Sequence, residues 1–243
     1  MDNHSGRALS FGKQASLYER LRPGYPAEAV EAFLPEPGRR VVDVGAGTGK
    51  LTATLLAAGH TVTAVEPDPD MRAVLAEGAP DVDVLDGTGE ALPLPDGSAD
   101  AICYGQSWHW VEPEAGAHEA RRVLTEDGVL ALLWNIPDTR QQWVKELYQL
   151  SHPGEDPLRE LRPMTLSGFA PGAMVRTDWR QRLARPEVVD LFSTFSRIAT
   201  SPPAQRAALL DGVHEIVTTH PDVADATEVE LPYVCVALHY RIG

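Results

Sequence analysis

The segment that most constrains the fold is residues 41–50, in which an apolar run leads directly into three closely spaced glycines. The β-branched residues before the glycines predict a short strand in the middle of a parallel sheet. Leucines at helical spacing after them predict a helix, and Thr48 is expected to cap its first turn. Glycine tolerates positive φ and leaves no Cβ between the backbone and a ligand. The segment therefore predicts a strand–turn–helix unit whose exposed N–H groups can contact a bound molecule.

Two acidic residues are expected at the same edge of this sheet. Asp43 lies near the end of the first strand, and Glu66 follows the next predicted strand, residues 61–65. Because the carboxyl ends of parallel strands meet at one edge, both carboxylates should project into one crevice. Two acids there favour a ligand that carries a cationic amine and a diol.

The glycine spacing argues against two other nucleotide-binding loops. The dinucleotide fingerprint is G-x-G-x-x-G, whereas this loop is G-x-G-x-G with an acid two residues before its first glycine. A carboxylate at Asp43 would repel a pyrophosphate but suits an ammonium group. Lys50 lacks the spacer and the following Ser or Thr of a Walker loop. On these residues alone, a tight turn that binds no ligand remains an alternative.

The residues that follow extend the pattern into a family resemblance. The glycine segment resembles motif I of the class I S-adenosylmethionine-dependent methyltransferases. Residues 66–68 resemble that family's ribose-binding acid, and residues 87–95 resemble its adenine loop. Residues 106–110 resemble the segment after the fourth strand in the small-molecule branch that carries a His-Trp pair, and residues 22–26 resemble the amino-terminal lid of that branch. The resemblance covers more than half of the chain, and its motifs are specific for the superfamily but not for the substrate.

The resemblance implies both a fold and a cofactor. The fold is α/β and Rossmann-like, with a seven-stranded, mostly parallel sheet whose last strand is antiparallel, helices on both faces and an N-terminal helical lid. The cofactor is S-adenosylmethionine, which leaves as S-adenosylhomocysteine. The cofactor-binding residues that it implies are Tyr18, Arg22, Asp43, Gly45, Ala46, Gly47, Glu66, Pro67, Met71, Thr88, Gly89, Glu90 and Gln106.

Some of these assignments have structural alternatives. Tyr18 and Arg22 would close over the methionine end of the cofactor, but Tyr18 can instead pack and Arg22 can be solvated. Met71 would form an apolar wall against the adenine ring, although a Met at helical spacing is more often a core residue. Thr88 stands where many relatives have Asp, and its neutral hydroxyl is a weaker acceptor for the adenine amino group.

His109 is the residue most suited to a chemical role. It follows the predicted fourth strand, so we expect its imidazole beside the reacting methyl group. Histidine titrates near neutral pH and can remove a proton from an attacking nucleophile, but it can equally contact the substrate or anchor the loop. Of its neighbours Trp108 and Trp110, we expect one to face the ligand. Asn135, just past the fifth strand, is expected either to point into the substrate pocket or to cap the next turn.

The chain of 243 residues suits one α/β domain with a modest appendage. We expect the helical lid at residues 1–38 and the methyltransferase domain at residues 39–243. Proline-rich residues 150–185 are expected to hold a variable substrate-recognition insertion. The last strand is predicted at residues 229–240, and the sixth at residues 175–183.

The composition of the chain limits the kinds of partner that we expect. The net charge of −14 makes a nucleic-acid substrate improbable, because most faces would repel a phosphate backbone. Apolar runs of signal-peptide or membrane-spanning length were not found, so a cytoplasmic protein without a membrane partner is expected. The eight histidines are scattered, and no metal site is expected. Monomer and homodimer are not distinguished.

The sequence therefore predicts methyl transfer from S-adenosylmethionine to the oxygen, nitrogen or carbon of a small organic molecule, and secondary metabolism is the expected setting. Attack is expected in line, with His109 assisting as a base or as a substrate contact. Two alternatives remain: an enzyme of the same fold that uses the cofactor for other chemistry such as cyclisation, and a non-catalytic protein that binds the cofactor or its demethylated product. A nicotinamide dehydrogenase is disfavoured by the glycine spacing.

Overall fold

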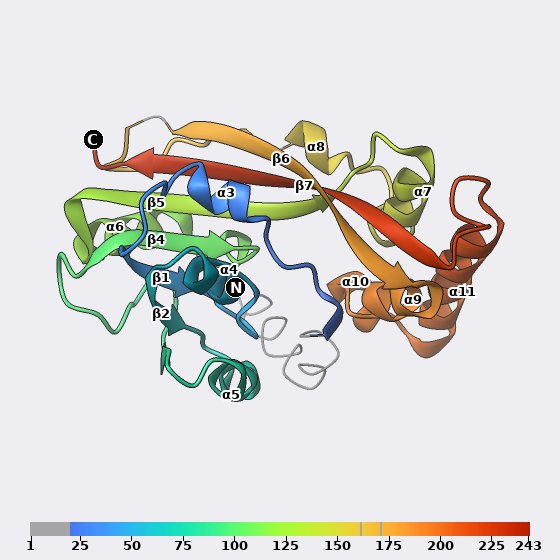
Figure 1. The fold of residues 1–243 in the computed structure, drawn as a ribbon, viewed down its shortest axis with the longest axis horizontal. Coiled ribbons are helices and arrows are strands. Elements are labelled where there is room, and N and C mark those ends of the chain that lie inside the picture. The colour runs from blue at the N-terminus through green and yellow to red at the C-terminus, as the bar shows by residue number, and fades with distance from the viewer. Residues whose placement is uncertain (1–19, 161, 171) are drawn as a thin grey trace.

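The computed structural model describes residues 20–160, 162–170 and 172–243 (Figure 1). Its central feature is one seven-stranded sheet with the order β3-β2-β1-β4-β5-β7-β6. β7 is antiparallel to both of its neighbours, while the other neighbouring strands run parallel. The strands are β1 Arg40–Val44, β2 Thr61–Val65, β3 Asp83–Leu85, β4 Ala99–Gly105, β5 Leu124–Pro137, β6 Ala173–Ala184 and β7 Glu228–Arg241. The predicted sheet with an antiparallel last strand is confirmed.

Helices cover both faces of this sheet, as predicted. The helices are α3 Ala27–Glu31, α4 Lys50–Ala57, α5 Pro69–Gly78, α6 Pro113–Val123, α7 Gln142–Ser151, α8 Pro157–Glu160, α9 Arg185–Ser193, α10 Ser196–Ala199 and α11 Pro203–Thr219. Alternate residues of each buried strand point to opposite faces. Val41 therefore packs with α3 and α4, whereas Val42 packs with α6 on the other side.

A second apolar core lies at the end of the sheet where β6 ends and β7 begins (Figure 1). It is built by α7, α9, α10 and α11, which we call the helical lobe. Leu21, from the amino-terminal segment, is also buried in this core. The helices of the lobe thus come from both sides of β6 in the sequence.

Part of residues 150–185, where a substrate-recognition insertion is expected, lies in the sheet. Residues 173–184, inside the predicted insertion at 150–185, form the edge strand β6 and belong to the sheet. Two predictions covered these residues: a sixth strand at residues 175–183 and an insertion at residues 150–185. An edge strand exposes many polar side chains, so its composition resembles that of a loop. Of the helical lid expected at residues 1–38, α3 is observed, while residues 1–19 lie outside the described residues.

The loop after β3 is fastened to α6 by one arginine. Arg122 donates to both carboxylate oxygens of Glu119 at 2.9 and 2.7 Å, to Asp96 at 2.6 Å, and to the carbonyls of Leu94 and Leu92 at 2.9 and 3.1 Å. Glu119 in turn accepts from the Leu92 N–H at 2.8 Å. These bonds hold residues 92–96, which form the second half of the predicted adenine loop and the residue after it.

We predict that Arg122→Ala lowers the free energy of unfolding by about 2 kcal/mol, because several hydrogen bonds to a charged group are lost together. Hydrogen exchange at residues 92–96 should accelerate. The matched control is Arg121→Ala, which removes a neighbouring charge from the same helix end, where the side chain contacts the Gly168 carbonyl instead. Equal exchange at residues 92–96 in both variants would contradict this role for Arg122.

Candidate functional site

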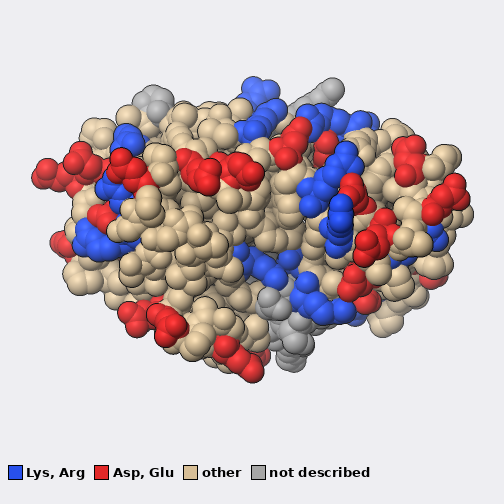
Figure 2. All heavy atoms as spheres, viewed as in Figure 1, with Lys and Arg blue, Asp and Glu red and all other residues tan. Residues whose placement is uncertain are grey.

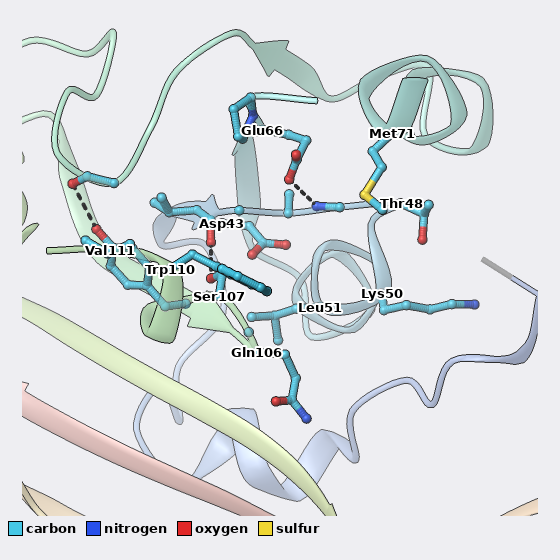
Figure 3. A pocket seen from close by; sticks show the side chains of 18 of the residues that line it. Asp43, Thr48, Lys50, Leu51, Glu66, Met71, Gln106, Ser107, Trp110 and Val111 are labelled. Atoms are coloured by element: carbon cyan, nitrogen blue, oxygen red, sulfur yellow. Dashed lines mark hydrogen bonds between the residues drawn. The ribbon is translucent and has the colours of Figure 1, made fainter. Parts of the chain in front are cut away.

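A cavity of about 400 Å³ opens at the carboxyl ends of β1, β2 and β4 (Figure 3). It gathers residues that the sequence had assigned to a cofactor. The predicted residues that line it are Arg22, Asp43, Gly45, Ala46, Gly47, Glu66, Pro67, Met71, Thr88, Gly89, Glu90, Gln106, Trp110 and Asn135. Tyr18 lies outside the described residues, and neither Trp108 nor His109 is among the lining residues.

The glycine loop, residues 45–49, shapes the floor of the cavity. Gly45, Gly47 and Gly49 have φ values of 65°, 58° and 93°, in the left-handed region that favours glycine. A Cβ on Gly45 would lie 2.5 Å from the Cβ of Ser107, so a larger residue does not fit there. The predicted strand–turn–helix unit thus depends on glycine for both conformation and space.

Two details of the loop differ from the prediction. The N–H groups of Gly45 and Ala46 donate to the Val65 carbonyl at 2.8 and 3.2 Å, so they contact neighbouring backbone rather than a ligand. The N-cap of α4 is Gly49 with no side-chain cap, and Thr48 does not cap the helix. The left-handed backbone at Gly49 separates Thr48 from the first helical turn. The Thr48 hydroxyl is instead buried without a partner, in a residue that lines the cavity.

Asp43 is a buried acid with one unused oxygen. Its side chain is 1% exposed, and its Oδ2 accepts from the Thr52 hydroxyl at 2.7 Å. Its Oδ1 has no partner within the described structure. Burial raises the pKa of the Asp43 carboxyl to about 7, and the nearby Glu66 adds to the effect. A cationic donor in the cavity would satisfy Oδ1 and favour the charged form.

Glu66 is held in place by the backbone. Its Oε2 accepts from the Gly47 N–H at 2.8 Å, and its Oε1 accepts from the Asp68 N–H at 2.9 Å. Burial raises the pKa of the Glu66 carboxyl, and these two bonds act against that rise. Each carboxylate oxygen can accept more than one hydrogen bond, so both can still receive hydroxyl donors. Fixed acceptors of this kind suit a vicinal diol.

The opposite wall combines an apolar side chain with a loop. Met71 lies on α5, and its sulfur would be 3.7 Å from a Cβ on Gly47. Thr88, Gly89 and Glu90 follow β3, and the Tyr104 hydroxyl donates to the Gly89 carbonyl at 3.4 Å. The Glu90 carboxylate accepts from the Glu112 N–H at 2.8 Å, which ties this loop to the start of α6.

The Trp-His-Trp segment, residues 108–110, forms a 3-10 helix in which the three rings have different surroundings. Trp108 is buried and meets Tyr104 edge to face at 4.8 Å, so it belongs to the core. Trp110 lines the cavity, as expected for one of the two indoles (Figure 3). His109 is exposed, and its ring lies 4.7 Å from that of Trp110. His109 is therefore not among the residues that line the cavity, although it neighbours Trp110, and its expected place beside the reacting methyl group stays a prediction.

Asn135 joins three parts of the chain at the far end of the cavity. Its side-chain amide donates to the Gly24 carbonyl at 2.7 Å, and its Oδ1 accepts from the Trp179 indole at 3.0 Å. Its backbone carbonyl accepts from the Gln106 side chain at 2.6 Å. Gln106 itself has a φ of 57°, a strained value for a residue other than glycine. Asn135 thus does not cap the following turn but fixes the lid segment against the sheet.

Several lining residues were not singled out from the sequence. Tyr25 belonged to the recognised lid segment, and its hydroxyl would lie 2.8 Å from a Cβ on Gly105. Ser107 adjoins Gln106, and its hydroxyl donates to the Val44 carbonyl at 2.6 Å. Their positions next to predicted site residues were the available signal. Trp179, which contacts Asn135, had no such signal because β6 is remote in sequence.

The residues that the structure describes contain no group of three or more His, Cys, Asp or Glu side chains suited to a metal ion. None of their helices is both long and apolar enough to cross a membrane.

The known proteins to which this chain is similar in sequence include methyltransferases. The family described as "Methyltransferase domain" matches residues 42–132. An uncharacterized methyltransferase of Mycobacterium tuberculosis is 41% identical over 236 residues, which cover 97% of each chain.

Solved structures agree in fold. A protein from Anaeromyxobacter dehalogenans has a TM-score of 0.64 at 20% identity, covering 90% of this chain and 96% of its own. A SAM-dependent methyltransferase from Thermotoga maritima has a TM-score of 0.51 at 20% identity, and the match covers 95% of this chain and 98% of that protein. The sheet order and the cavity at its carboxyl edge agree with the near full-length sequence match. This chain therefore belongs to the methyltransferase family.

Proposed function

We propose that this methyltransferase uses S-adenosylmethionine to methylate a small organic molecule. The observation that carries the proposal is the unpartnered Asp43 Oδ1, buried in the same cavity as the fixed carboxylate of Glu66. A cavity of about 400 Å³ is within the range of small-molecule sites. A ligand with an ammonium group and a ribose diol matches the two acids, and the name of the Thermotoga maritima protein points to the same cofactor.

Each part of this cofactor has a matching group in the cavity. Asp43 would receive the ammonium group, and Glu66 the ribose hydroxyls. Met71 and the segment Thr88–Glu90 would flank the adenine, and Arg22 would meet the carboxylate. When bound, S-adenosylmethionine supplies an electron-poor methyl group on a sulfonium. The residues of this chain then have to orient an acceptor toward that methyl and exclude water.

The acceptor end is formed by Tyr25, Gln106, Trp110 and Asn135. An indole such as Trp110 favours a nearby sulfonium through cation–π attraction. The lid segment that Asn135 holds lies over this end of the sheet, which suits a small acceptor better than a polymer. On the face shown in Figure 2, basic side chains gather right of centre and below the centre, with acidic side chains among and around them. The net charge of −14 disfavours a nucleic-acid acceptor.

Proton removal by His109 has no geometric support, since the ring is exposed and outside the cavity lining. Among the described residues, none of the lining side chains is a histidine. We therefore assign most of the rate enhancement to alignment of the acceptor with the methyl group, and at most a peripheral contact to His109.

The direct test incubates the protein with methyl-labelled S-adenosylmethionine and fractionated small-molecule extract, and follows the products by mass spectrometry. Gain of one labelled methyl by a small molecule supports the proposal. Binding of S-adenosylhomocysteine without any labelled product would favour a non-catalytic binding protein instead, and a product altered without a methyl gain would favour other chemistry on the same fold.

Glu66→Ala should weaken the binding of S-adenosylhomocysteine by about 30-fold or more, because two charge-assisted hydrogen bonds to the ribose are lost. Calorimetric titration measures the change. Glu77→Ala, which removes an exposed acid from α5, serves as the matched control and should bind like the wild type. Unchanged affinity in a folded Glu66→Ala variant would reject the ribose role.

The affinity for S-adenosylhomocysteine should depend on pH through Asp43. In the unliganded protein its pKa is about 7, so the carboxyl is largely protonated at lower pH. An ammonium ligand favours the charged form, and binding at lower pH must therefore release this proton. We expect affinity to fall by up to about tenfold per pH unit below pH 7 and to level off above it. Asp43→Asn should flatten the profile, and a flat wild-type profile would contradict the assignment.

With an acceptor identified, His109→Ala should change kcat by no more than about threefold, because His109 is not among the residues that line the cavity. A general base contributes about 10²- to 10⁴-fold. Trp110→Ala, which alters a residue of the lining, should lower kcat/KM more strongly. A loss of 100-fold or more in His109→Ala would restore the role predicted from the sequence.

A further inference from the structure

Arg22 lines the cavity but is anchored outside it. Its Nε donates to the Thr194 hydroxyl at 3.0 Å, and its Nη2 donates to the Thr194 carbonyl at 3.1 Å. Its guanidinium carbon lies 4.4 Å from the centre of the Phe195 ring. Thr194 and Phe195 belong to the helical lobe, between α9 and α10, and Figure 1 shows the start of the described chain beside these helices. A residue of the lid segment is therefore positioned by a part of the chain more than 170 residues away.

The contacts fit a cation in three ways. Thr194 is the C-cap of α9, where carbonyl groups lack helical partners and the helix dipole favours positive charge. The Thr194 hydroxyl donates its own proton to the Leu191 carbonyl at 2.6 Å, so its oxygen is left to accept from Arg22. Phe195 offers the face of an aromatic ring, which attracts a guanidinium.

Thr194 and Phe195, which contact Arg22, are themselves buried and packed. Thr194 is 1% exposed, and Phe195 stacks on Phe192 with their ring centres 4.6 Å apart. Arg20, two residues before Arg22, pairs with Glu187 at 3.3 Å on the same helix α9. The Leu21 carbonyl accepts from Gln181 at 2.8 Å. The backbone on either side of the guanidinium is thus fixed to β6 and α9.

Thr194 does not line the cavity, whereas Arg22 does. An arginine side chain carries about 2 kcal/mol of rotamer entropy, which a ligand must overcome when it immobilises a free side chain. Contacts that fix the side chain beforehand remove part of that cost from binding. Arg22 is a lining residue of the cavity while it makes these contacts, so a ligand carboxylate that reaches this side chain would meet one already held in place.

We propose that Thr194 is a positioning residue which, through Arg22, sets the affinity for the carboxylate of the cofactor's amino-acid end. This inference rests on the proposed function, because it takes S-adenosylmethionine as the ligand. A carboxylate on the acceptor would present the same chemistry to Arg22, so the test uses cofactor analogues in the absence of any acceptor.

The experiment compares Thr194→Val with Thr194→Ser, by calorimetric titration with two probes. S-adenosylhomocysteine carries the amino-acid end, and 5′-methylthioadenosine lacks it. Valine keeps the shape of threonine but removes the acceptor oxygen, whereas serine keeps that oxygen. We expect Thr194→Val to weaken S-adenosylhomocysteine binding by about tenfold and to leave 5′-methylthioadenosine within about twofold of wild type. Thr194→Ser should bind both probes like the wild type.

Thr194→Ala is a second route to the same result if Thr194→Val does not fold. Alanine also removes the acceptor oxygen but leaves Arg22 unchanged, so it should show the same selective loss. Wild-type binding of S-adenosylhomocysteine by Thr194→Val, or an equal loss for both probes, would overturn the inference while leaving the proposed function intact. If the wild-type protein binds neither probe, the proposed function itself fails, and this inference fails with it.

Discussion

The site depends on the hydrogen bond from the Gly47 N–H to the carboxylate of Glu66. At 2.8 Å it joins the loop after β1 to the end of β2, and it holds the loop in the left-handed conformation that only glycine adopts without strain. The second oxygen of Glu66 is fixed by the Asp68 N–H, and Asp68 also caps α5, which carries Met71. One buried acid thus sets the floor and one wall of the cavity.

The acids of this cavity are costly to bury in the absence of a cation. Asp43 and Glu66 are 1% and 6% exposed, and burial raises the pKa of both carboxyls. Thr52 satisfies one oxygen of Asp43 and leaves the other without a partner. Sites that hold such groups lose stability to gain affinity, because a ligand that supplies the missing donor and charge relieves the cost. The two buried acids therefore support the proposal that this cavity takes a ligand with a cationic group.

Hydrophobic periodicity and turn residues predicted those parts of the fold that depend on residues close together in the sequence. The strand and glycine loop and the antiparallel last strand were found from periodicity, turn residues and the family resemblance. The contact between Asn135 and Trp179 was not, because it depends on the pairing of β5 and β6 with β7. The absence of His109 from the cavity lining was not predicted either, since a 3-10 helix of three residues leaves no periodic signal that shows which ring faces inward.

The segment from Arg20 to Tyr25 shows why the acceptor end is the hardest part to infer. At its start, Leu21 is buried in the helical lobe. At its end, the Gly24 carbonyl accepts from Asn135 and the Tyr25 carbonyl accepts from Thr54 on α4 at 3.2 Å. The segment therefore bridges the lobe and the sheet across the cavity. Changes in the helical lobe can then alter which acceptor fits without touching the glycine loop, so one cofactor site can serve different acceptors within the same fold.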